Sequence, residues 1–112
     1  MARQARDNGF FEWACFISQQ AALKAIKSVY QRHGAVAWGH SVMDLLSGLQ
    51  QRHNVPQPLF EIARSLDRSY VPARYPDGFP RGKPADYFGQ EEANDAVSGS
   101  ERILQFCDGL LA

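Results

Sequence analysis

The clearest periodic pattern in the chain lies in its first third, where apolar residues recur in steps of three and four. Such steps place side chains on one face of an α-helix. They predict a helix from about Gly9 to about His33, with Gly34 as its left-handed C-terminal stop. The expected buried stripe of this helix is Phe10, Ala14, Ile17, Ala21, Ala25 and Val29.

Two shorter amphipathic segments follow. Ser41 is followed three residues later by Asp44, an arrangement typical of a helix N-terminus, and the helix it opens should end before Pro56. A third helix is predicted to begin near Pro58, whose fixed φ suits a first turn, and to end before Pro72. The apolar positions of these two helices are Val42, Leu45, Leu46, Leu49, Leu59, Ile62, Ala63, Leu66 and Tyr70.

Residues 71–84 read VPARYPDGFPRGKP and contain four prolines and two glycines, so we expect a long loop there. A last helix is predicted from roughly Gly89 to Leu111, with Gly99 as its weakest interior position. Its expected buried stripe is Ala93, Ala96, Val97, Ser100, Ile103, Leu104, Cys107 and Leu110. Four amphipathic helices predict an all-α, up-and-down four-helix bundle that forms a single domain over residues 1–112.

Composition narrows the class of protein. Twelve basic side chains balance twelve acidic ones, so the whole molecule does not attract a phosphate backbone and we expect no nucleic-acid partner. No apolar run approaches the roughly 20 residues that span a bilayer, and the N-terminus lacks the apolar stretch of a secretory signal. We therefore expect a soluble, cytoplasmic protein without a membrane partner.

Cysteine and histidine spacing gives no sign of a metal site. Cys15 and Cys107 have no C-x-x-C partner, and we expect both to be reduced core residues. His33, His40 and His53 have no partner four residues away on a helix, which is the spacing that holds zinc in helical motifs. The sequence therefore predicts no metal.

Three motifs in order along the chain carry a resemblance to a known family. The segment GFFEWACFISQQAALKAIKSVY spans residues 9–30, His40 and Ser41 precede a leucine-bearing helix, and a tyrosine at position 70 is followed by R-Y-P-D at residues 74–77. This order resembles the HEPN domain family, and in particular its branch with an RYPD loop. The resemblance covers nearly the whole chain and implies a compact, often dimeric helical bundle.

Two departures from the family pattern bear on function. Only nine residues precede Phe10, so the family's first helix is expected to be shortened, and another chain could cover the face it leaves. The ribonuclease branch carries an arginine and a histidine four to six residues apart near its last core helix, and this sequence has no such pair. In that branch the histidine supplies the imidazole that exchanges a proton near neutral pH. Because this sequence lacks the pair, we expect no catalytic residues.

A local basic patch is the best candidate for a binding site. Arg68, Arg74, Arg81 and Lys83 lie within sixteen residues and are opposed there only by Asp77. Arg64 and Arg68 stand one helical turn apart, so a bound phosphate would relieve their repulsion. The alternative is a solvated helix face with Glu61 and Asp67 nearby. The candidate ligand-binding residues are Lys24, Lys27, His40, Arg64, Arg68, Arg74, Tyr75 and Asp77.

Several of these residues also fit a structural role. Arg74 to Asp77 could form a turn, the aromatic residues near it could pin the loop to the core, and His40 could be a packing residue. Lys24 and Lys27 could simply face solvent.

The resemblance and the patch together predict a small protein that binds ATP or another nucleotide. We expect it to act as a homodimer and as partner of a separately encoded minimal nucleotidyltransferase. One alternative is a purely structural protein-protein interaction module. A second is a metal-independent RNase toxin of a toxin-antitoxin pair.

Overall fold

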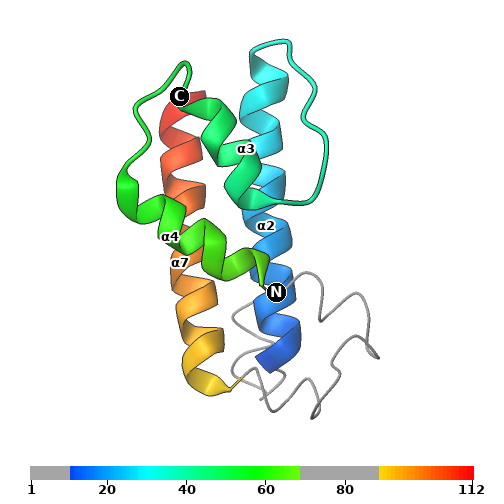
Figure 1. Ribbon diagram of the computed structural model, residues 1–112, viewed down its shortest axis with the longest axis vertical. Coiled ribbons are helices and arrows are strands. Elements are labelled where there is room, and N and C mark those ends of the chain that lie inside the picture. Colours follow the sequence, from blue (N-terminus) through cyan, green and yellow to red (C-terminus); the bar gives the residue numbers. More distant parts are fainter. Residues whose placement is uncertain (1–10, 69–88) are drawn as a thin grey trace.

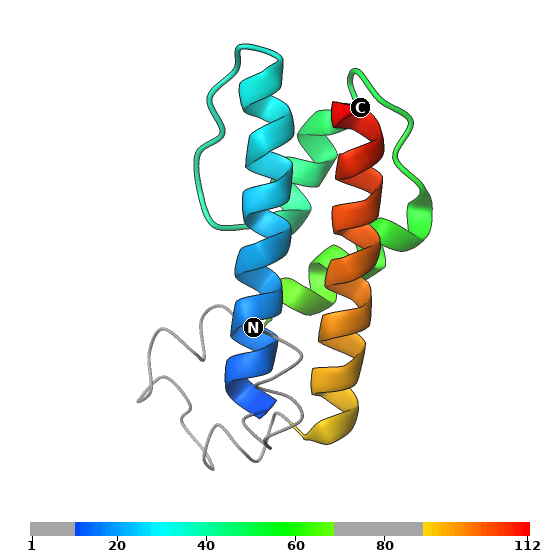
Figure 2. The same ribbon diagram turned by 180° about the vertical axis from the view of Figure 1, so that it is seen from behind.

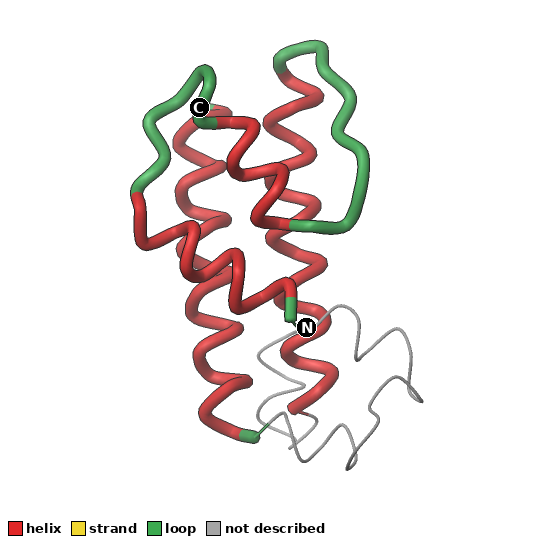
Figure 3. The backbone as a smooth tube through the Cα atoms, in the orientation of Figure 1, coloured by secondary structure: helices red, strands yellow, loops and turns green. Residues whose placement is uncertain are grey.

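The computed structural model of the protein describes residues 11–68 and 89–112, and all regular structure in these two ranges is helical. Its helices are α2 (Phe11–Arg32), α3 (Val42–Leu49), α4 (Gln57–Asp67) and α7 (Gln90–Leu111). Figure 3 shows the loops that join α2 to α3 and α3 to α4. The predicted all-α bundle is confirmed for the described part of the chain. The expected short first helix and the loop at 71–84 lie outside it.

The two long helices form one layer and the two short helices form another. Helices α2 and α7 lie side by side and run in the same direction, as both faces of the molecule show (Figures 1 and 2). Helices α3 and α4 cross over one face of this pair (Figure 1). None of the described helices is long and apolar enough to span a membrane.

Helix α2 agrees with its predicted span from Phe11 onward, and two members of the predicted buried stripe, Ala14 and Val29, are buried. The other members of the stripe are not confirmed. Ile17, Ala21 and Ala25 are partly exposed, and Phe10 lies outside the described residues. The buried residues are Ala14, Cys15, Ser18, Gln19, Ala22, Leu23, Ile26 and Val29. The stripe was wrong at Ile17, Ala21 and Ala25, and the two alanines lose little when they are partly exposed. It also left out two polar residues, Ser18 and Gln19, that are buried.

The starts of the short helices follow local sequence rules. The Ser41 hydroxyl accepts a hydrogen bond of 3.1 Å from the Asp44 amide, so the predicted N-cap of α3 is confirmed. Pro58 lies in the first turn of α4, where the missing N–H costs nothing. Helix α4 ends at Asp67, so Tyr70 is not one of its residues and lies outside the described part of the chain.

Helix α7 starts and ends within a residue of its prediction. Gly99, predicted only as a position of low helix propensity, has a packing role. It is buried, and a Cβ built on it would lie 2.7 Å from Cγ2 of Ile62 on α4. The glycine therefore allows α4 to approach α7 more closely than any side chain would permit. Leu104 and Leu110, which were predicted to be buried, are partly exposed. Cys15 and Cys107 are buried free thiols, as expected.

Candidate functional site

The predicted basic pair on α4 is exposed. Arg64 makes no hydrogen bond or ion pair with any described residue, and Arg68 donates one bond of 3.2 Å from Nη2 to the Ser65 hydroxyl. Both guanidinium groups are therefore open to a ligand from solvent. The other members of the patch, Arg74, Tyr75 and Asp77, lie outside the described residues, as do Arg81 and Lys83.

The predicted residues on α2 and its following loop lie elsewhere. Lys24 is exposed on the side of α2 opposite its buried residues, and Lys27 is partly exposed. The side chain of His40 is exposed, while its backbone carbonyl accepts a hydrogen bond of 2.8 Å from Nε2 of Gln19. The structure therefore places the predicted residues on separate elements. Among the described ones it brings together only neighbours on one helix, Lys24 with Lys27 on α2 and Arg64 with Arg68 at the end of α4.

Among the described residues, the most extensive polar network joins α2, α3 and α4, and we call it the polar junction. Its centre is the carboxylate of Asp67, the last residue of α4. One oxygen accepts from the Val42 amide at 2.8 Å and from Gln19 Nε2 at 3.3 Å. The other accepts from the Ser41 hydroxyl at 2.9 Å and from the Met43 amide at 3.0 Å.

This arrangement decides what the N-terminus of α3 can bind. The exposed amides of a helix N-terminus attract anions, because the helix dipole is positive there. At the polar junction the protein's own Asp67 already occupies that place. The interpretation of Asp67 as part of a solvated face was therefore wrong, because its half-buried carboxylate is a tertiary cap that stabilises α3.

Gln19 is the buried member of the junction. Its Nε2 donates to the His40 carbonyl and to Asp67, and its Oε1 accepts a bond of 2.7 Å from Gln20 Nε2. A buried amide is tolerated only when it is hydrogen-bonded in this way. Sequence reasoning missed Gln19; the one available signal was its place on α2, between the buried positions Cys15 and Leu23.

A second polar contact lies at the far end of α2. His33 follows the last turn of α2 and His53 follows α3, and their Nε2 atoms are 2.8 Å apart. Nearby, the Tyr30 hydroxyl donates a bond of 2.7 Å to the Leu45 carbonyl, and burial raises the pKa of this hydroxyl. The local spacing rule could not find the histidine pair, because twenty residues separate its members in sequence.

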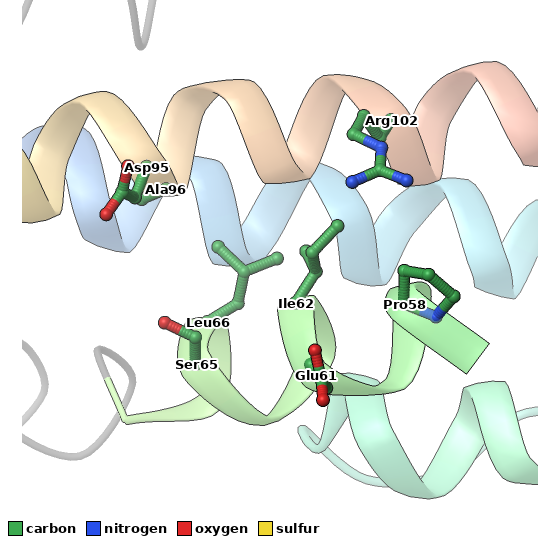
Figure 4. Close-up of a pocket in the computed structure, with 8 residues that line it drawn as sticks. All are labelled: Pro58, Glu61, Ile62, Ser65, Leu66, Asp95, Ala96 and Arg102. Carbon is green, nitrogen blue, oxygen red and sulfur yellow. The ribbon is translucent and has the colours of Figure 1, made fainter. Parts of the chain in front are cut away.

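A hollow of about 230 Å³ lies between α4 and α7 (Figure 4). Ile62 and Leu66 point from α4 toward α7, and Arg102 and Asp95 stand at opposite ends (Figure 4). Glu61 adds a second carboxylate to the lining. Two carboxylates against one guanidinium do not favour a phosphate, and none of the predicted site residues lines this hollow.

Comparison with known proteins agrees with the resemblance seen in the sequence. The profile of the HEPN domain family matches residues 1–110. No curated protein matches the chain.

Three solved structures are similar over almost the whole chain. TT1696 from Thermus thermophilus is 41% identical with a TM-score of 0.90, and the match covers 97% of this chain and 86% of that one. A HEPN domain protein from Thermotoga maritima, tm0613, is 43% identical with a TM-score of 0.80, over 98% and 87% of the two chains. ST0689, an archaeal HEPN homologue, is 36% identical with a TM-score of 0.81, over 99% and 86%.

Proposed function

The chain belongs to the HEPN domain family, and from this premise we propose that it binds the phosphate groups of a nucleotide through Arg64 and Arg68 on α4. The observation that carries the proposal is a pair of exposed guanidinium groups, one helical turn apart, of which one has no described partner and the other only a neutral hydroxyl. Guanidinium groups bind phosphate through two parallel charge-assisted hydrogen bonds.

The rest of the described surface supports this choice. The N-terminus of α3 is capped by Asp67, and the hollow between α4 and α7 carries more negative than positive charge. On α4, by contrast, the like charges of Arg64 and Arg68 repel each other, and an anion bound between them relieves this repulsion. In the sequence, α4 is followed by the R-Y-P-D segment at residues 74–77, which contains another arginine.

The wider proposal concerns partners. We place the chain in the family branch with the RYPD loop and without the ribonuclease Arg/His pair, and we assign it a binding role rather than a catalytic one. In this role a homodimer works with a separately encoded nucleotidyltransferase in the cytoplasm. ATP or a related nucleotide is the ligand.

Calorimetry with ATP, inorganic phosphate and adenosine tests the binding site. We expect ATP to bind and adenosine not to bind, because the phosphates supply the contacts. Arg64→Ala and Arg68→Ala should each weaken ATP binding by about tenfold or more, as expected for a lost charge-assisted hydrogen bond. Arg74→Ala tests the R-Y-P-D segment in the same way.

Arg32→Ala is the matched control, since Arg32 is also exposed at the end of a helix but lies on α2. Its affinity for ATP should stay within twofold of the wild type. Absence of ATP binding at millimolar concentration, or binding that ignores both α4 substitutions, would remove the proposal.

One observation favours a second candidate, a protein-protein interaction module. Trp13, Val36 and Trp38 are 55%, 70% and 83% exposed, which is unusual for large apolar side chains. If the exposed loop residues Val36 and Trp38 hold two chains together, light scattering will show a dimer that Trp38→Ser shifts toward monomer. A monomeric wild type would contradict the dimer in both candidates.

A further inference from the structure

The contact between His33 and His53 restricts the protonation of both rings. Their Nε2 atoms are 2.8 Å apart, so one must donate a proton and the other must accept it through an unprotonated nitrogen. The ring planes are inclined by 27° and the ring centres lie 5.0 Å apart. The distance between the ring centres exceeds the distance between the two Nε2 atoms by about the width of one imidazole ring. The rings therefore meet edge to edge at their Nε2 atoms.

The surroundings of the pair favour an added positive charge. The His33 amide bonds to the Val29 and Tyr30 carbonyls, and the His53 amide bonds to the Leu49 carbonyl, so each ring follows the last turn of a helix. The C-terminal ends of α2 and α3 therefore both direct their negative dipole ends toward this region. The charged side chains that directly precede the two histidines in sequence are Arg32 and Arg52, both exposed to solvent, which screens them.

There is also room for further ligands beside His33. A hollow of about 190 Å³ adjoins His33 and is lined in addition by Tyr30, Ala35, Leu49 and Arg52. Both histidines are only partly buried, so water reaches this region. A metal ion held by two imidazoles needs this space, because water must complete its coordination.

We propose that His33 and His53 form a two-histidine site for a borderline divalent ion, Zn²⁺, Ni²⁺ or Cu²⁺, for which neutral imidazole is a preferred ligand. With bonds of about 2.0 Å, two imidazole nitrogens on adjacent corners of a square-planar or octahedral ion lie roughly 2.8 Å apart. On a tetrahedral ion they lie roughly 3.3 Å apart. The observed spacing is close to the first value and requires only a small opening for the second.

Binding needs one proton to move but none to leave the protein. The ring that donates from Nε2 in the free protein takes the tautomer protonated at Nδ1, and each Nε2 then gives its lone pair to the ion. The two rings turn so that these lone pairs meet at the metal instead of at each other. No other histidine, cysteine or carboxylate of the described residues joins them in a larger cluster, so waters fill the remaining positions.

The test is a calorimetric titration of the untagged protein with Zn²⁺ or Cu²⁺ alone, without nucleotide. We expect one ion per chain. His33→Gln and His53→Gln should each weaken binding at least tenfold, whereas His40→Gln, which changes the remaining histidine, should leave the affinity within twofold. Glutamine can still donate a hydrogen bond to the remaining imidazole, so these variants keep the tie between the helix ends.

Electron paramagnetic resonance of the Cu²⁺ form gives a second readout, in which the wild type shows two imidazole nitrogens and each Gln variant shows one. Circular dichroism checks that the variants remain helical. Absence of saturable binding by the wild type up to millimolar metal would overturn the site. Binding that survives in His33→Gln and His53→Gln would overturn it equally.

Discussion

Helix α4 is fixed at two places by different physical means. At its C-terminal end, Asp67 accepts four hydrogen bonds at the polar junction. In its middle, Ile62 packs against the bare backbone of Gly99 on α7. The contact at Asp67 depends on the direction of its hydrogen bonds and on the charge of the carboxylate, and it fills little volume. The contact between Ile62 and Gly99 depends only on the volume of the side chains.

The difference follows from the lengths of the helices. Helix α3 has 8 residues and could not persist alone, because so short a helix does not repay the cost of its nucleation. The Asp67 carboxylate accepts hydrogen bonds from the first amides of α3 and so supplies part of the missing stability. Helix α7 has 22 residues and needs no such help, so its contact with α4 is set by how closely the two backbones approach. Polar substitutions should therefore matter most at the junction and volume changes most at the α4–α7 contact.

Asp67→Ala should have the largest effect. It leaves the Val42 and Met43 amides, the Ser41 hydroxyl and part of the Gln19 amide without their acceptor. We expect a loss of about 3 kcal/mol in the free energy of unfolding, measured by urea denaturation. Asp95→Ala, which removes a carboxylate at the rim of the α4–α7 hollow, is the control and should change stability by less than about 0.5 kcal/mol. A loss below about 1 kcal/mol for Asp67→Ala would show that the junction is not a stabilising centre.

Gly99→Ala should destabilise by about 1–2 kcal/mol, because the added methyl group would press on Cγ2 of Ile62. In an Ile62→Ala background the obstacle is gone, and the same substitution should stabilise by up to about 1 kcal/mol through the better helix propensity of alanine. Gly109→Ala, whose Cβ meets nothing within 4 Å, should stabilise in both backgrounds. An unchanged sign in the Ile62→Ala background would contradict the steric explanation.

Two serines between α2 and α7 should respond in opposite directions. The Ser100 hydroxyl donates a bond of 2.8 Å to the Ser18 carbonyl, whereas the buried Ser18 hydroxyl has no hydrogen-bond partner among the described residues. Ser100→Ala should therefore cost about 1 kcal/mol, and Ser18→Ala should be neutral or slightly stabilising. Thermal denaturation of both variants measures the contrast. A clear loss on Ser18→Ala would mean that this hydroxyl has a partner after all.

The smallest effect concerns the Cys107 thiol on α7. Burial, and then the nearby Asp108 carboxylate, raise its pKa from 9.0 to about 11. The thiol stays protonated in the folded protein at a pH where it ionises in the unfolded chain, so its contribution to stability is complete below the unfolded pKa of 9.0 and lost as the pH rises toward about 11. In a Cys15→Ala variant, alkylation of Cys107 at mildly alkaline pH should be slow in the native protein and fast in urea. Rapid native alkylation would show that the thiol is accessible.

Predicting the fold from sequence succeeded where local chemistry decides the outcome. Ser41 marks the start of α3, Pro58 lies in the first turn of α4, and α7 begins at Gln90 directly after Gly89. It failed where alanine carried the pattern, since Ala21 and Ala25 are apolar but small enough to be left partly exposed. It failed also for Gln19, whose burial is acceptable only because partners from other elements surround it.

The candidate site divides in the same way. Arg64 and Arg68 could be paired from sequence alone, because a helix fixes the distance between residues four apart. Asp67 looked like one more surface charge until the fold placed it against the first amides of α3. His33 and His53 came together only because α2 and α3 end side by side.

The sequence by itself determined that this protein is a bundle of amphipathic helices, where α3, α4 and α7 begin, and to which family it belongs. Only the tertiary structure decided which charged side chains form hydrogen bonds with the protein's own backbone and which remain exposed to solvent. The physical reason is that helix formation depends on neighbours within a turn or two of the chain, whereas the partner of a buried polar group is chosen by the packing of distant segments.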